Sequence, residues 1–199
     1  IKKYVSSGSI LDIGCGVGWF LEAAKKDGFK VYGQELSRDL ADFTRDLLGI
    51  KVFQIDISEI NLKFDVITMF DLIEHVPDPL KLVMDCKKLL NPDGVILAFT
   101  PNYDSFGIKE MGKDSSLVCP PAHLTYFTKK SVQELVRKVN MNLLHYETKG
   151  MDIADLGAYY SYLGEKKISE KFFKLFKKLQ PIIDESESAN HMRFVINNI

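Results

Sequence analysis

The segment Ile10–Phe20, with the sequence ILDIGCGVGWF, constrains the fold of this 199-residue chain more than any other. Its residues Ile10, Leu11 and Ile13 form a short apolar run of the kind that a fully buried parallel strand shows. Three glycines follow at alternate positions, and residues 19–26 have the pattern of the first turns of a helix. A strand, a glycine turn and a helix in this order bring backbone N–H groups and a helix N-terminus close to a small ligand.

The spacing of the glycines separates two classes of ligand. A dinucleotide-binding fingerprint has the spacing G-x-G-x-x-G, and its third glycine would fall on Trp19. Asp12 stands two residues before the first glycine, where its charge would repel a pyrophosphate but would suit the ammonium of a methionine moiety. The segment therefore favours a ligand with a cationic end over a dinucleotide.

The run LDIGCGVG resembles motif I of the class I S-adenosylmethionine-dependent methyltransferases, and the resemblance extends from Ser9 to the last predicted strand. It implies an α/β fold, a Rossmann-like doubly wound sheet of seven strands. The sheet would be mostly parallel with an antiparallel last strand, and helices would cover both faces. The implied cofactor is S-adenosylmethionine, whose product is S-adenosylhomocysteine (SAH). The length and the apolar content suit a single domain over 1–199.

Apolar periodicity predicts the remaining elements. The expected strands after the first are 30–36, 51–57, 64–70, 95–100, 141–148 and 192–197, and the expected helices are 19–26, 38–48, 79–90 and one that begins after Thr128. Residues 58–63 are too few for a crossover helix, and 101–128 has no clear period.

A helical insertion is expected at 152–190, between the last two strands. We predict that it forms a lid or an acceptor-selecting wall. A basic amphipathic helix resting on a membrane surface or on a partner chain is one alternative, and a helix packed on its own sheet is the other. The polar residues 184–190 at its end are expected to be mobile.

Acidic residues at strand ends are the candidates for cofactor contacts. Glu35 follows the first glycine by about 20 residues, where doubly wound nucleotide sites place the acid that binds ribose hydroxyls. In the resembled family an acid at Asp56 accepts from the adenine amine while Ile57 packs on the ring; the alternative is that Asp56 caps the following turn with Ser58. The predicted cofactor-binding set is Asp12, Gly14, Cys15, Gly16, Gly18, Glu35, Leu36, Asp56, Ile57, Phe70 and Asp71.

The segment after the fourth strand carries Asp71, Glu74 and His75 at positions i, i+3 and i+4. On a helical turn these side chains would share one face. The segment resembles the metal-binding E-x-x-E-H stretch of the O-methyltransferases of ubiquinone biosynthesis, with Asp71 in place of the first Glu. We expect no metal, with Glu74 and His75 ordering the turn beneath the cofactor, and a divalent cation held by these three residues is the alternative.

The run PPAHLTYFT, which ends at Thr128, resembles a stretch of small-molecule and sugar-modifying methyltransferases. His123 in this run is the candidate general base, because an imidazole that titrates near neutral pH can take a proton from a hydroxyl or an amine. A purely structural histidine is the alternative. Tyr103, Tyr126 and His75 are the candidate acceptor-binding residues.

Composition narrows the class of partner and the setting. A net charge of -1 without a basic block makes nucleic acid an unexpected partner. Three widely spaced cysteines with no C-x-x-C pair fit a reducing, cytoplasmic setting, and no apolar run is long enough to span a bilayer. Because the chain begins at Ile1 and not at Met, we expect it to be a piece of a longer one. No feature indicates an oligomeric state.

The function predicted from these features is methyl transfer from S-adenosylmethionine to an oxygen or nitrogen atom of a small molecule. Sugars and lipid- or quinone-like molecules are the candidate acceptors. One alternative is a non-catalytic protein that binds S-adenosylmethionine or acts as a scaffold. A nucleotide-dependent oxidoreductase is the other, and Trp19 and Asp12 argue against it.

Overall fold

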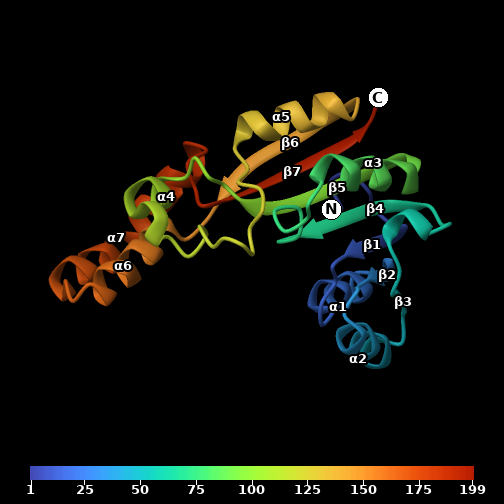
Figure 1. Ribbon diagram of the computed structural model, residues 1–199, viewed down its shortest axis with the longest axis horizontal. Coiled ribbons are helices and arrows are strands. Elements are labelled where there is room, and N and C mark those ends of the chain that lie inside the picture. Colours follow the sequence, from blue (N-terminus) through green and yellow to red (C-terminus); the bar gives the residue numbers. More distant parts are fainter.

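The computed structural model describes residues 1–199 and contains one seven-stranded sheet (Figure 1). The strand order is β3-β2-β1-β4-β5-β7-β6. The first five strands pair in parallel, and β7 is antiparallel to both of its neighbours. The strands are β1 (Ser9–Ile13), β2 (Lys30–Gln34), β3 (Lys51–Phe53), β4 (Phe64–Phe70), β5 (Leu90–Pro101), β6 (Met141–Lys149) and β7 (His191–Asn198). The predicted sheet, with its antiparallel last strand, is confirmed.

Helices cover both faces of this sheet, as predicted. Buried residues of β1 alternate between two apolar clusters, with Leu11 and Ile13 in one and Ile10 in the other. Helices α1 and α2 contribute to the cluster of Ile10, and helices α3 and α5 contribute to the other cluster. The helices of the fold are α1 (Trp19–Lys26), α2 (Arg38–Leu48), α3 (Pro79–Leu89), α4 (Phe106–Met111), α5 (Lys129–Lys138), α6 (Asp152–Tyr162) and α7 (Lys166–Glu185). None of them combines the length and the apolar character that crossing a membrane requires.

The chain reverses its direction of sheet growth between β1 and β4. Strands β2 and β3 extend the sheet on one side of β1, whereas β4 and β5 extend it on the other. In open α/β sheets a ligand binds at the carboxyl ends of the strands that flank such a reversal. The glycine turn after β1 and the segment that begins with Asp71 after β4 both lie at this position.

Two strands differ from their predicted bounds by more than two residues. β3 ends at Phe53 because Asp56 caps a short 3₁₀ helix, η1 (Ile57–Glu59), which turns the chain away. β5 begins earlier than predicted, since Leu90 already pairs with Phe64 and residues 91–94 bulge out of the ladder before pairing resumes. The aperiodic segment 101–128 contains α4 and a second 3₁₀ helix, η2 (Gly112–Asp114).

The predicted helical insertion is a hairpin of α6 and α7. Figure 1 shows the hairpin projecting beyond the ends of β5 and β6, with α4 beside it. Tyr160 of α6 stacks on Phe172 of α7, with ring centroids 5.4 Å apart. Gly157 faces the ring of Phe173, so close that an added Cβ would lie 3.0 Å from it. The two helices therefore pack mainly on each other and on α4.

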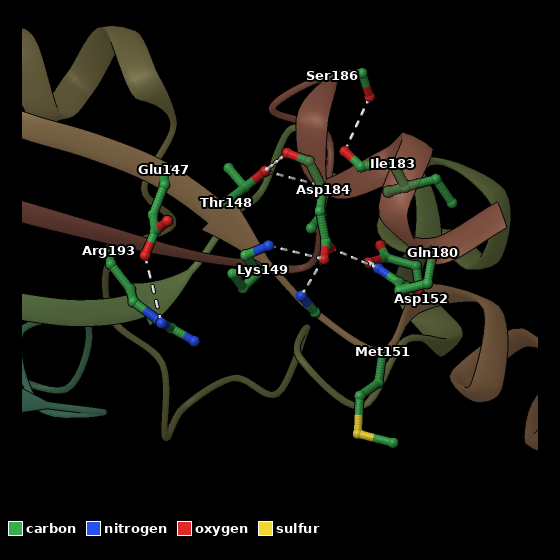
Figure 2. Close-up of polar contacts among 12 residues, drawn as sticks. Glu147, Thr148, Lys149, Met151, Asp152, Gln180, Ile183, Asp184, Ser186 and Arg193 are labelled. Carbon is green, nitrogen blue, oxygen red and sulfur yellow. Dashed lines mark hydrogen bonds and ion pairs between the residues drawn. The ribbon is translucent and has the colours of Figure 1, made fainter. Parts of the chain in front are cut away.

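Buried polar groups fix the base of this hairpin to the sheet (Figure 2). The fully buried Asp152 accepts hydrogen bonds from the backbone N–H groups of Gly107 and Asn190, both at 2.9 Å. The amide of Gln180 donates to Asp152 at 3.2 Å and to Asp184 at 3.0 Å. Satisfied buried networks of this kind make a segment rigid. Asp184 and Asn190, the two ends of the segment 184–190, belong to this network. This argues against the expected mobile segment and favours a fixed wall over a lid.

Candidate functional site

The glycine turn after β1 has a backbone that requires glycine. Gly14, Gly16 and Gly18 have φ values of 68°, 51° and 79°, in the left-handed region that other residues rarely adopt. The N–H of Gly16 donates to Glu35 Oε2 at 3.0 Å, and Thr44 of α2 donates to the Gly16 carbonyl at 2.7 Å. An added Cβ at Gly16 would meet nothing within 4 Å. The bonds to Glu35 and Thr44 thus fix the turn, and Gly16 borders open space.

Asp12 lies buried at the carboxyl end of β1. The only hydrogen bond to its side chain comes from the hydroxyl of Thr68 on β4, which donates to Oδ1 at 2.6 Å. Burial raises the pKa of Asp12 to about 7, and the Thr68 bond offsets part of that rise. A cationic group placed beside this carboxylate would favour its ionised form. The position suits the ammonium-binding role predicted from the sequence.

Glu35 follows β2 and faces the glycine turn. Its second carboxylate oxygen accepts from the N–H of Ser37 at 2.8 Å, so the carboxylate is held by two backbone donors. Each oxygen has a further lone pair that could accept from a ligand hydroxyl. The neighbouring Leu36 is 67% exposed. Cys15, inside the turn, is buried, and this burial raises the pKa of its thiol to about 12.

The two residues predicted to contact adenine have other partners in the fold. Asp56 accepts from the backbone N–H of Ser58 at 3.0 Å and from its hydroxyl, and these bonds lower the pKa of the Asp56 carboxyl. Ile57 is buried in the larger apolar cluster. The alternative interpretation of Asp56 as the cap of the turn is therefore what the structure shows. Ile57 packs inward, and its contact with a ring stays a prediction.

The segment after β4 lies on the glycine turn. Asp71 has a positive φ of 48°, which is uncommon for a residue other than glycine and marks local strain of the kind found at functional sites. The side chain of Leu72 lies so close to Gly14 that an added Cβ there would be 2.9 Å from it. Phe70 contacts Phe20 of α1 edge-on, with centroids 4.9 Å apart. The predicted residues Phe70 and Asp71 thus adjoin the turn.

Glu74 is a buried carboxylate with one oxygen unused. Thr100 of β5 donates to Oε2 at 2.8 Å, whereas Oε1 has no hydrogen-bond partner. Oε1 lies 3.9 Å from Nε2 of His75. A buried carboxylate oxygen without a partner in the chain is costly, so Oε1 is available to a group from outside the chain.

Two imidazoles meet beside Glu74. Nδ1 of His75 lies 2.8 Å from the Ala122 carbonyl, and Nδ1 of His123 lies 2.9 Å from the Leu117 carbonyl. Since a carbonyl only accepts, each Nδ1 carries the hydrogen, and Nε2 would offer a lone pair whenever the ring is neutral. The two ring centroids are 4.7 Å apart.

These three side chains form a group that could hold a metal ion. Glu74, His75 and His123 each offer a ligand atom, and the three atoms lie within 4.8 Å of one another. A backbone carbonyl behind each imidazole is the partner that orients metal-binding histidines. The structure brings His123 to Glu74 and His75 in this group, where the sequence suggested Asp71. The donor set fits a divalent cation.

An aromatic wall continues from the two histidines. Tyr126 lies 6.3 Å from His123 and 5.1 Å from Tyr103, measured between ring centroids. The hydroxyl of Tyr126 is buried and has no hydrogen-bond partner. All four residues predicted for catalysis and acceptor binding (His75, Tyr103, His123 and Tyr126) therefore lie together, and their roles stay predictions.

Sequence reasoning missed the residues that support this site. Thr68 and Thr100 sit inside apolar strands and bond to carboxylates 56 and 26 residues away, so no local pattern marks them. His191 at the start of β7 stacks on Phe99, with centroids 4.7 Å apart, and burial lowers the pKa of its ring. A histidine directly before the last predicted strand was the available signal for it.

Comparisons with known proteins point in one direction. Residues 2–146 match a family model described as a methyltransferase domain. A ubiquinone biosynthesis O-methyltransferase from Actinobacillus pleuropneumoniae is 37% identical over 106 residues, which cover 47% of this chain and 45% of that protein. The chain thus spans about half the length of the curated relatives it matches.

Solved structures share the fold across nearly the whole chain. A methyltransferase from Thermotoga maritima, described as a possible histamine N-methyltransferase, has 19% identity and a TM-score of 0.65, covering 96% of this chain and 82% of its own. The plantazolicin methyltransferase in complex with SAH has 18% identity and a TM-score of 0.62, covering 100% of this chain and 79% of its own. At these identities the likeness shows the fold alone.

Proposed function

This chain belongs to the methyltransferase domain family, and from that premise we propose that it transfers a methyl group from S-adenosylmethionine to a small molecule. The observation that carries the proposal is that two groups of residues meet at the carboxyl ends of β1 and β4. A glycine turn with acids beside it adjoins a segment that leads to two imidazoles with free Nε2 atoms. Cofactor binding and proton removal would therefore take place side by side.

The first group of residues is proposed to hold S-adenosylmethionine. The backbone of the turn would approach the ligand at Gly16, where open space begins. Asp12 would pair with the ammonium of the methionine moiety, and Glu35 would accept hydrogen bonds from the ribose hydroxyls. The cofactor supplies a methyl group already activated on a sulfonium.

The second group of residues is proposed to prepare the acceptor. His123 would take the proton from an acceptor hydroxyl or amine through Nε2 as the acceptor atom bonds to the methyl carbon, whose bond to sulfur would break to leave SAH. Most of the rate enhancement is expected from holding the acceptor in line with the sulfonium, which needs little further chemistry from the protein. Tyr103 and Tyr126 would pack against the acceptor.

The acceptor is proposed to be a small molecule methylated on oxygen or nitrogen. The name of the relative from Actinobacillus and the aromatic wall both favour a quinone-like ring, since aromatic side chains pair with ring faces and edges. The likeness of the His123 run to sugar-modifying enzymes supports a sugar as the second class.

A divalent cation at Glu74, His75 and His123 is a second arrangement that one observation favours. Glu74 Oε1 is buried without a partner, and cation binding would satisfy it. Such an ion would supply Lewis-acid polarisation of an acceptor oxygen. Calorimetric titration with Mg²⁺, Mn²⁺ or Zn²⁺ tests this, because Glu74→Gln should abolish binding if the site is real.

Substitution of His123 tests the catalytic proposal. His123→Ala should lower turnover by about 10²- to 10⁴-fold while SAH affinity stays unchanged. His145→Ala is the matched control, since His145 lies on β6 away from the site and pairs only with Glu147. Unchanged turnover in His123→Ala with SAH affinity intact would remove His123 from the mechanism.

A further inference from the structure

Helix α7 carries an apolar stripe that the fold leaves uncovered. Ile168, Leu175 and Ile182 are spaced seven residues apart, so they lie along one side of the helix. All three are exposed, and Ile182 is 62% exposed. Lys171 and Lys178 follow the first two by three residues and therefore border the stripe.

The stripe is distinct from the face of α7 that packs on the protein. That face carries Ser169 and Gln180, which are buried, and Phe172, which stacks on Tyr160 of α6. Figure 2 shows Gln180 pointing into the polar network at the base of the hairpin. The exposed stripe is consequently not needed to hold α7 in place.

The turn between α6 and α7 adds apolar surface at the tip of the hairpin. Tyr162, the last residue of α6, is 88% exposed at this tip, and Leu163 beside it is also exposed. Figure 1 shows this tip as the part of the molecule that projects farthest from the sheet. A projecting tip can reach a flat surface without interference from the rest of the fold.

The positive charge of α7 is concentrated in one part of the helix and is unpaired. Residues 166–178 contain six lysines and one glutamate, although the whole chain has a net charge of -1. None of these six lysines forms an ion pair within the chain, whereas the exposed Lys26, Lys81 and Lys88 all do. The free ammonium groups are available to an external anionic surface.

We propose that α7 and the tip of the hairpin bind the surface of an anionic lipid bilayer. A helix with apolar residues bordered by lysines lies in the plane of such a surface, with its apolar side chains among the headgroups and its lysines beside the phosphates. A second copy of the chain fits the stripe less well, because pairing two stripes would bring two rows of lysines together.

Vesicle flotation of the full chain tests this proposal. We expect binding to vesicles rich in phosphatidylglycerol, little binding to pure phosphatidylcholine, and release of the bound protein at high salt. Lys171→Gln with Lys178→Gln should weaken binding about thirtyfold, since each lysine near an anionic surface contributes about 1 kcal/mol. Leu175→Ser should weaken it as well, which pure charge attraction would not predict.

The control is Lys30→Gln with Lys51→Gln, which removes the same charge from two exposed lysines at the other edge of the sheet. This variant should bind anionic vesicles as the wild type does. Equal weakening in both double variants would overturn the assignment to α7. Absence of binding to anionic vesicles at low salt would overturn the proposal, as would a dimer that forms through α7 and binds no vesicles. None of these outcomes depends on methyl transfer.

Discussion

Asp12→Asn should make the protein more stable at alkaline pH while it weakens cofactor binding. The Asp12 carboxyl is buried, and its pKa is about 7 in the folded chain. In the unfolded chain an Asp titrates near about 4. The raised pKa means that folding opposes ionisation, and the difference corresponds to about 4 kcal/mol once both states are ionised.

The sign of the effect follows from this difference. Between about pH 4 and pH 7 the unfolded chain loses its Asp12 proton while the folded chain keeps it, so this group lowers the free energy of unfolding as pH rises. Asn is neutral throughout and its oxygen can still accept from Thr68. Urea unfolding followed by circular dichroism should therefore find Asp12→Asn more stable than wild type by up to about 4 kcal/mol at pH 8, with the difference vanishing near pH 4.

Asp85→Asn provides a control of opposite sign. Burial raises the pKa of Asp85, but its bonds from Lys81 at 2.7 Å and Lys88 at 2.8 Å outweigh burial and lower it below the ordinary value. Its replacement should therefore destabilise the protein at neutral pH. The reasoning about Asp12 would be refuted if Asp12→Asn were less stable than the wild type at pH 8. It would also be refuted if the difference in unfolding free energy between the two proteins were as large at pH 4 as at pH 8.

Three further outcomes are expected. Because the ammonium of SAH should pair with ionised Asp12, calorimetric titration should find wild-type affinity falling below about pH 7, by at most about tenfold per pH unit, and Asp12→Asn should lack this dependence. Gly14→Val should abolish SAH binding and lower the melting temperature, because its φ of 68° and the Leu72 contact leave no room for a side chain. Gly157→Val should overpack the ring of Phe173 and destabilise the hairpin by about 1–3 kcal/mol, with SAH affinity unchanged.

The elements that the sequence predicts well are those that local pattern decides. Strand β4 begins and ends at the predicted residues, because polar residues on either side of a mainly apolar run mark its two ends. Strand β3 is shorter than predicted. The Asp56 side chain caps the 3₁₀ helix η1, so the chain turns there and does not continue as a strand. The start of β5 depends on a bulge against Phe64, which no local pattern encodes.

In the candidate site, too, local pattern predicts some features and the tertiary fold decides the others. The glycine turn and its acids were identified from spacing and resemblance, and the structure brings Glu35 to the turn. The bond from Thr68 to Asp12 links residues 56 apart, and the contact of His75 with His123 links residues of two separate loops. Such pairings follow from the tertiary fold and could not be predicted from the sequence.

Titration of the full chain with SAH, compared between two glycine variants, tests the central claim most directly. Gly16→Asn and Gly49→Asn both place a residue that tolerates positive φ where an added Cβ meets nothing within 4 Å, but only Gly16 belongs to the proposed cofactor site. The account predicts one SAH site in the wild type and in Gly49→Asn, and none in Gly16→Asn. Binding that survives in Gly16→Asn, or binding of NADH in place of SAH by the wild type, would contradict it.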